Sequence, residues 1–178
     1  MPPHLKALVL REREIIALLN RQIETVTAER DALLSEVQTT GSTPTPAHML
    51  LGLKGIGPGF AGALWSEGLL RRFDNGRQVA AYAGLAPTPG EAGRSTMNRA
   101  VSKAGNPRLR AIAVEMAWLW LRHRPDSALA RWVHDRVRRT GPRARTVTIV
   151  ALARKLLVAL WKYVTSGVVT PGAAMKTV

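Results

Sequence analysis

Residues 50–61 read Leu-Leu-Gly-Leu-Lys-Gly-Ile-Gly-Pro-Gly-Phe-Ala, and this stretch predicts two helices joined by a tight turn. The apolar run from His48 to Leu53 is typical of a short helix. Pro58 suits the first position of a second helix, because an N–H group at that position would have no partner within the helix. Helices are therefore expected on both sides of the turn.

The Gly55-Ile56-Gly57 turn is the candidate binding element of this stretch. Its two glycines can adopt positive φ and have no Cβ to hold another molecule away. Backbone N–H groups at such a turn, beside a helix N-terminus, form a binding site for an anion. The pattern is that of a helix-hairpin-helix, which binds nucleic-acid backbone without base recognition. An ordinary tight turn between packed helices is the alternative.

The positive charge of the chain is unevenly distributed. The formal net charge is +14, yet residues 1–40 contain five Lys and Arg against six Asp and Glu. Residues 41–178 therefore contain 21 basic against six acidic side chains, a net charge of +15. Such a basic domain indicates a polyanionic partner, and together with the glycine turn it favours nucleic acid. An anionic membrane surface or a purely solubilising charge is the alternative.

At 178 residues the chain is long enough for one or two domains with a hydrophobic core. It has no cysteine, which excludes disulfides and zinc–thiolate sites and favours a reducing compartment. No apolar run reaches the length of a membrane span, and the N-terminus lacks the layout of a signal peptide. We therefore expect a cytoplasmic, nucleoid-associated protein with no membrane partner.

From residue 5 to residue 37 apolar side chains recur at spacings of four and three, which predicts a long helix with a coiled-coil seam. Polar residues flank the seam, so it is narrow and needs a partner. We expect a second copy of the chain, giving a homo-oligomer through residues 5–37; a helix of the same chain that folds back is the alternative. The seam positions are Leu5, Val9, Glu12, Ile16, Leu19, Ile23, Val26, Arg30, Leu33 and Val37.

The remaining pattern predicts an all-α fold, because helical spacing recurs and strand-like alternation is missing. The long N-terminal coiled-coil helix would be followed by a compact helical domain that contains the helix-hairpin-helix. The expected divisions are a coiled-coil helix over 1–40, a Gly/Ser/Thr/Pro linker over 41–46, a helical DNA-binding domain over 47–166 and a tail over 167–178.

A second candidate binding element lies at the start of a predicted helix. Asn106 can cap this helix and Pro107 can occupy its first position. Lys103 precedes the helix and Arg108 and Arg110 lie in its first turn, where positive charge opposes the helix dipole. A phosphate held at the helix N-terminus would explain these cations. A plain cap with solvated arginines is the alternative.

Metal chemistry has little support in the sequence. The histidines, His4, His48, His123 and His134, are scattered, and no run of His, Asp and Glu has metal-ligand spacing. We expect no metal site in this chain.

An ordered series of motifs makes residues 5–165 resemble the C-terminal half of the insertion sequence one-ten (one-sixteen, nine-oh-two) family of transposases. The glycine turn and the segment 73–84 also fit this family. The motifs are Gly84-Leu85-Ala86-Pro87 with the loop after it, Ser102-Lys103-Ala104-Gly105-Asn106 with Arg108-Leu109-Arg110, and Ala153-Arg154-Lys155-Leu156-Leu157.

The resemblance implies a full-length enzyme in which a resolvase-like domain with a DEDD set of metal-binding acids precedes this part. It also implies a coiled coil for assembly, a nucleophilic serine in the C-terminal half and, in some members, a structured guide RNA. The chain starts where the coiled coil of the family starts, so we expect the DEDD domain to be absent and Mg²⁺ to bind only when that domain is supplied.

The family loop after Gly-Leu-x-Pro carries Ser-Gly, and that serine is the nucleophile. The matching residues here are Ala92 and Gly93. Alanine has no hydroxyl group, so it cannot form the covalent link that nucleophilic catalysis requires. Ser95 is the fallback nucleophile, and Thr96 is a weaker one.

These observations favour a transposase C-terminal domain that binds DNA in transposition and recombination but does not cleave it alone. The alternatives are a strand-transfer enzyme that uses Ser95 with an acidic half supplied in trans, and a regulator that titrates full-length transposase. The expected DNA-binding residues are Gly55, Ile56, Gly57, Arg94, Arg99, Lys103, Asn106, Arg108 and Arg110.

Overall fold

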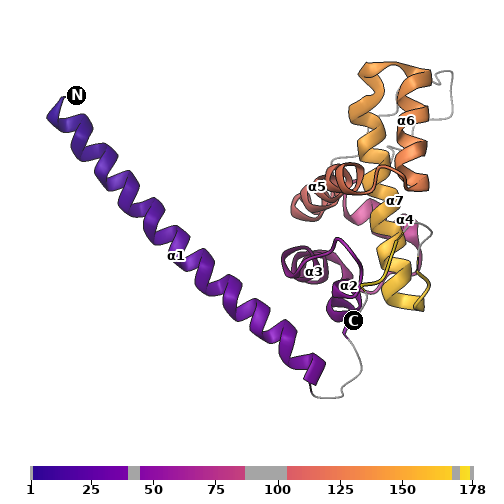
Figure 1. Ribbon diagram of the computed structural model, residues 1–178, viewed down its shortest axis with the longest axis horizontal. Coiled ribbons are helices and arrows are strands. Elements are labelled where there is room, and N and C mark those ends of the chain that lie inside the picture. The colour runs from indigo at the N-terminus through magenta and orange to yellow at the C-terminus, as the bar shows by residue number, and fades with distance from the viewer. Residues whose placement is uncertain (1, 40–44, 87–103, 170–172, 177–178) are drawn as a thin grey trace. The chain divides into compact units, whose positions relative to one another are not determined.

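The computed structural model describes residues 2–39, 45–86, 104–169 and 173–176, and the chain divides into two compact units, residues 1–43 and 44–178 (Figure 1). All regular elements of the described residues are helices, which confirms the predicted all-α fold with a long N-terminal helix ahead of a compact helical region. Among these residues the one strand-type pairing is an isolated antiparallel bridge between Leu53 and Met175.

The first unit contains the helix α1 (Pro3–Thr39), and the other helices belong to the second unit. Two of these elements depart from α-helical geometry, namely the π-helical turn η1 and the 3-10 turn η2. The second unit contains α2 (Pro46–Leu51), α3 (Pro58–Leu64), η1 (Trp65–Leu69), α4 (Gly76–Tyr82), α5 (Pro107–His123), α6 (Ala128–Thr140), η2 (Pro142–Ala144) and α7 (Arg145–Ser166).

The helix α1 exposes the apolar side chains of the predicted seam from Leu5 to Leu33. Ile23 and Val26 are 62% and 64% exposed, so most of their surface would be available to a partner helix. Leu8, Ile15 and Leu18, which lie beside the seam, are exposed as well. The long helix is as predicted, whereas self-association through residues 5–37 stays a prediction.

The second unit packs around α7, which contacts α2, α4, α5 and α6. Eight residues of this helix between Thr148 and Tyr163 are buried, as expected for a helix that packs against the core, whereas Lys155 and Lys162 are exposed. Leu152 and Leu157 are fully buried, and truncation of either to alanine should cost about 2–5 kcal/mol. Figure 1 shows α6 and α7 as neighbouring antiparallel helices joined through η2.

The glycine turn joins α2 to α3 as the sequence predicts, but its two glycines differ. Gly55 has a φ of +97°, whereas Gly57 has a φ of −93° and is extended. Positive φ is therefore required at one position and not at both. Ile56, between them, is buried and packs with Leu53 and Leu64 in the core.

Residues from the predicted tail lie against this turn. The Lys54 N–H donates to the carbonyl of Ala174 at 2.7 Å, and the Lys176 N–H donates to the carbonyl of Gly52 at 2.8 Å. The Lys176 ammonium also donates to the carbonyl of Ile56 at 3.1 Å. Residues 173–176 are thus part of the second unit and cover the carbonyl side of the turn.

Candidate nucleic-acid interface

The end of α4 and the start of α5 lie side by side and bracket the segment 87–103. The Asn106 N–H donates to the carbonyl of Tyr82 at 2.7 Å. Gly105 has a φ of +134°, and a Cβ on it would lie 2.5 Å from the same carbonyl oxygen. Glycine is required here because any side chain would collide with backbone. This explains in structural terms the Gly105-Asn106 pair at the end of the motif Ser102-Lys103-Ala104-Gly105-Asn106.

Asn106 is committed to hydrogen bonds within the protein. Its Oδ1 accepts from the N–H groups of Arg108 and Leu109 at 2.9 and 3.0 Å, and its carbonyl accepts from the Arg110 N–H at 3.2 Å. Pro107 has no N–H group, so the first turn of α5 has no free backbone donor to offer a phosphate. The helix cap is as predicted, but a phosphate at this helix start could contact side chains alone.

A carboxylate of the protein itself lies at this helix start. Glu67 accepts a hydrogen bond from Asn106 Nδ2 at 2.9 Å and lies 3.4 Å from the Arg108 guanidinium. The hydrogen bond from Asn106 is the main cause that lowers the pKa of Glu67 from its usual 4.5; partial burial opposes it, and the hydrogen bond and charge of Arg108 lower it further. Glu67 therefore supplies negative charge beside the cations at the start of α5. A bound phosphate is not the only group that would favour cations there. Arg108 is exposed and Arg110 is half-buried.

Several predicted site residues fall outside the described residues. These are the family serine position Ala92, the fallback nucleophile Ser95 and the predicted DNA contacts Arg94, Arg99 and Lys103.

The α2–α3 turn keeps donors available on one side. Among the described residues, none accepts a hydrogen bond from the N–H groups of Gly55 and Gly57. A Cβ built on Gly57 would meet no atom within 4 Å, so the space beside this residue is open. Ile56 differs from its neighbours because its side chain is buried and its N–H donates to Leu53 at 3.2 Å. Two of the three predicted turn residues therefore offer donors to a ligand.

The strongest cationic site is a groove that the sequence analysis did not identify. It is a hollow of about 1010 Å³ between the start of α4, α6 and α7. Of the described residues, five cations and no carboxylate line it, which favours a positive potential in the hollow. We call it the basic groove; its charged residues are Arg77, Arg136, Arg154, Lys155 and Lys162.

Trp132 lies in the wall of the basic groove and organises two of its cations. The Lys155 ammonium is 4.9 Å from the centre of the indole ring, and the Arg136 guanidinium is 5.8 Å from it. Both distances fit cation–π contacts. These contacts hold the charges in place without neutralising them, so the groove remains available to an anion.

A sequence signal for the groove exists in α7. Ala151, Lys155, Val158 and Lys162 follow one another at spacings of four, three and four, which places them on one helix face. Most other residues of this helix are apolar, so the two lysines stand out in the sequence. The basic groove was not predicted because two of its other cations come from α4 and α6, which only the fold brings close to α7.

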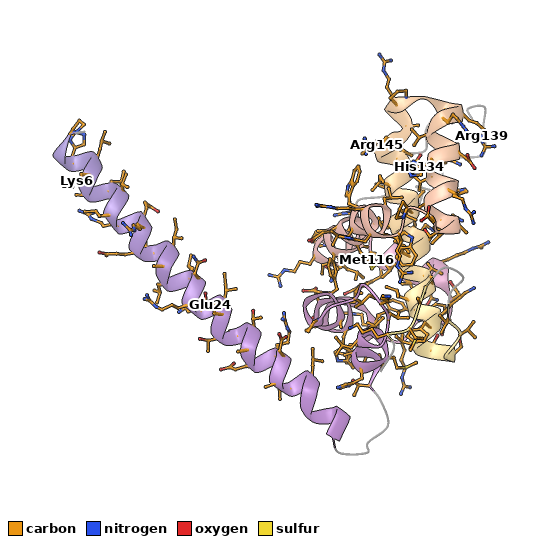
Figure 2. All side chains as sticks on the ribbon, viewed as in Figure 1. Lys6, Glu24, Met116, His134, Arg139 and Arg145 are labelled. Atoms are coloured by element: carbon orange, nitrogen blue, oxygen red, sulfur yellow. The ribbon has the colours of Figure 1, made fainter. Side chains whose placement is uncertain are left out.

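Further cations cluster where α6 passes into α7. Figure 2 shows Arg139 and Arg145 at this end of the second unit. The Arg145 guanidinium lies 5.2 Å from the ring centre of Trp118 on α5. Arg138 differs because it forms a 2.6 Å ion pair with Asp135. Arg139 and Arg145 thus add positive charge at the end of the second unit where α6 and α7 are joined.

In the described part of the chain, no group of three or more His, Cys, Asp and Glu side chains could hold a metal ion. No helix in those ranges has the length and apolar character needed to cross a bilayer.

Comparison with known proteins relates the chain to transposases. Residues 47–133 match the family described as "Transposase IS116/IS110/IS902 family". The chain is 56% identical over 184 residues to "Putative transposase y4rJ" of Sinorhizobium fredii, covering 99% of this chain and 46% of that protein. It is 28% identical over 172 residues to "Transposase for insertion sequence element IS1328" of Yersinia enterocolitica, covering 95% and 48%. The chain spans a little under half the length of the curated relatives it matches.

Proposed function

The chain belongs to the IS116/IS110/IS902 transposase family, and on that premise we propose that its second unit binds the phosphate backbone of DNA during transposition. The observation that carries this proposal is the basic groove, which is lined by five cations and by no carboxylate within the part of the chain that the structure describes. Neutralising phosphates with such cations releases condensed counterions, which drives binding and makes it independent of base sequence. Binding of this kind would locate the protein at the nucleoid.

The α2–α3 turn supports the same function from another surface of the unit. The N–H groups of Gly55 and Gly57 have no acceptor among the described residues, and the space beside Gly57 is open. A phosphate oxygen that approaches the turn would therefore gain hydrogen bonds from donors that are otherwise satisfied only by water. In this proposal the groove supplies most of the affinity and the turn fixes the position of one strand.

The test is a salt titration of DNA binding by fluorescence anisotropy. If the five groove cations each neutralise one phosphate, the affinity should fall about 500-fold between 50 and 200 mM salt. The double variant Arg154→Gln/Lys155→Gln should lower both the affinity and the salt slope, the latter by about 1.8. Arg138→Gln is the matched control, because this arginine already pairs with Asp135.

An unchanged salt slope in the double variant would contradict binding through the groove. A structured RNA is included as competitor, because an RNA backbone presents the same phosphates. Displacement of DNA by RNA at equal concentration would assign the groove to the guide RNA that the family resemblance implies.

We further propose that this chain forms no covalent link to DNA by itself. The residue that matches the family serine is Ala92, and an alanine side chain has no nucleophilic atom. Strand transfer would then need a serine, an acidic domain with Mg²⁺, or both, from another molecule. Ser95 is the alternative nucleophile within the chain.

The exposed seam of α1 supports assembly with another copy of the same helix. That copy can belong to an identical chain, which gives a homo-oligomer, or to a full-length transposase. In the second case this chain would titrate the full-length enzyme as a regulator.

A further inference from the structure

A second hollow lies between the α2–α3 turn, the C-terminal half of α5 and α7, and its wall is mainly aromatic and aliphatic. Its volume is about 360 Å³, which is within the range of small-molecule sites. Three aromatic side chains, Phe60, Trp120 and Tyr163, line it. We call this hollow the aromatic pocket.

The aromatic side chains of the pocket have little hydrogen-bonding capacity left. The Trp120 indole N–H donates to the Ser127 hydroxyl at 2.9 Å, and the Tyr163 hydroxyl donates to the Met175 sulfur at 3.8 Å. Phe60 has no polar group. These rings therefore offer a ligand apolar and stacking surface, and any polar recognition must come from other residues.

Arg124 lines the pocket and has one polar atom without a partner among the described residues. Its Nη2 is buried and donates no hydrogen bond to them, although a guanidinium is always charged and has five N–H donors. Buried donors are nearly always bonded, so this atom indicates a missing acceptor. Lys54 and His123 also line the pocket, both exposed, and no carboxylate does. The polar part of a ligand must therefore be an acceptor and is best anionic.

A flat aromatic group that carries acceptors and a negative charge matches this wall. A nucleotide has this chemistry, since every base has a π face that stacks on aromatic side chains whatever its sequence. An aliphatic carboxylate would satisfy Arg124 but would not use the rings. A neutral aromatic compound would use the rings but would leave the guanidinium without a counter-charge.

We propose that the aromatic pocket binds one nucleotide that is unstacked from a nucleic-acid strand, with the base against the aromatic rings and its acceptors or phosphate at Arg124. This inference rests on the proposed DNA binding. The pocket adjoins the α2–α3 turn, since Lys54, Gly55 and Ile56 line it. A strand held at the turn is thus adjacent to the pocket, and extrusion costs least for a base that is mismatched or already single-stranded.

The experiment compares the affinity of the full chain for a duplex with one central mismatch and for the fully paired duplex. Wild type should prefer the mismatched duplex about tenfold, because the unstacked base gains a stacking site. Arg124→Met and Phe60→Leu should abolish this preference while keeping the affinity for the paired duplex. Arg122→Met is the matched control, since Arg122 is an exposed cation on α5 outside the pocket lining and should keep the preference.

A second arm titrates free deoxythymidine monophosphate, and thermal melting of each variant confirms that it is folded. Mononucleotide binding that is lost in Arg124→Met supports the pocket chemistry. Mononucleotide binding without any mismatch preference overturns extrusion and leaves a site for free nucleotides. Equal affinity of wild type for both duplexes, without mononucleotide binding, overturns the proposal altogether. Failure of the proposed DNA binding would give a different result from failure of the pocket proposal. In that case fully paired DNA would bind neither the wild type nor the Arg154→Gln/Lys155→Gln variant.

Discussion

The side-chain amide of Asn106 donates a 2.9 Å hydrogen bond to the carboxylate of Glu67, which lies 39 positions earlier in the chain. The same nitrogen also lies 3.2 Å from the backbone carbonyl of Glu67, while the side-chain oxygen caps α5. One asparagine thus fixes the start of α5 and ties it to the π-helical turn η1.

Asn106→Ala should therefore destabilise the protein more than the loss of an ordinary cap. Substitution of a cap residue costs about 0.5–2 kcal/mol, and loss of the hydrogen bonds that the Asn106 amide donates to Glu67 should add to that cost. Asn75→Ala is the matched control, since Asn75 caps α4 through the N–H groups of Arg77 and Gln78 at 3.0 and 3.1 Å. Urea unfolding measures both variants, and equal losses would show that the Glu67 contact adds nothing.

The lowered pKa of Glu67 predicts a contribution to acid sensitivity. The hydrogen bond from Asn106 favours the charged carboxylate in the folded state, so the folded pKa lies below the usual 4.5. The stabilisation is complete above the unfolded pKa and is lost as the pH falls through 4.5 toward the lower folded value. Glu67→Gln should thus flatten the fall in melting temperature below pH 5. A variant that loses stability with acid as steeply as wild type would contradict this link.

Gly57→Val should weaken DNA binding without unfolding the protein. At a φ of −93° and with no atom within 4 Å of a Cβ, valine is accommodated by the fold, so a lower affinity would come from blocked approach of the DNA backbone. Gly105→Ala gives the contrast, since its Cβ would lie 2.5 Å from the Tyr82 carbonyl and should lower the melting temperature strongly. If the Gly57 variant binds DNA as wild type does, the turn is only structural.

The helix starts and the Gly55-Ile56-Gly57 turn could be predicted from local signals, because proline, glycine and asparagine act on their immediate neighbours. Pro58 and Asn106 begin helices as their chemistry requires. The basic groove could not be predicted in this way, since Arg77, Arg136 and Lys155 come from three helices that only tertiary packing brings together. For the same reason the sequence did not predict that Glu67 lies beside Arg108. It predicted a phosphate at the start of α5, where the backbone N–H groups already donate to Asn106.

Leu19→Asp/Val26→Asp should lower the oligomeric mass measured by light scattering. Leu19 and Val26 lie on the seam of α1 and are 50% and 64% exposed. If the chains associate through this face, the two aspartates of the variant would be buried as unpaired charges, which opposes association. Ala28→Asp is the control, because it places the same charge on an exposed position nine residues after Leu19, on the opposite side of the helix. An unchanged mass in the double variant would locate the association surface elsewhere.

The last prediction concerns covalent chemistry at Ala92 and Ser95. A serine nucleophile needs a base or metal to activate it and donors that hold the scissile phosphate, so a hydroxyl alone is insufficient. Wild type and Ala92→Ser should therefore both form no covalent adduct with suicide DNA substrates in Mg²⁺. Addition of a family DEDD domain in trans should yield adducts with Ala92→Ser and none with wild type. Denaturing gels resolve these species, with Ser95→Ala as the third protein. An adduct formed by wild type that disappears in Ser95→Ala would instead establish Ser95 as the nucleophile and this chain as a strand-transfer enzyme.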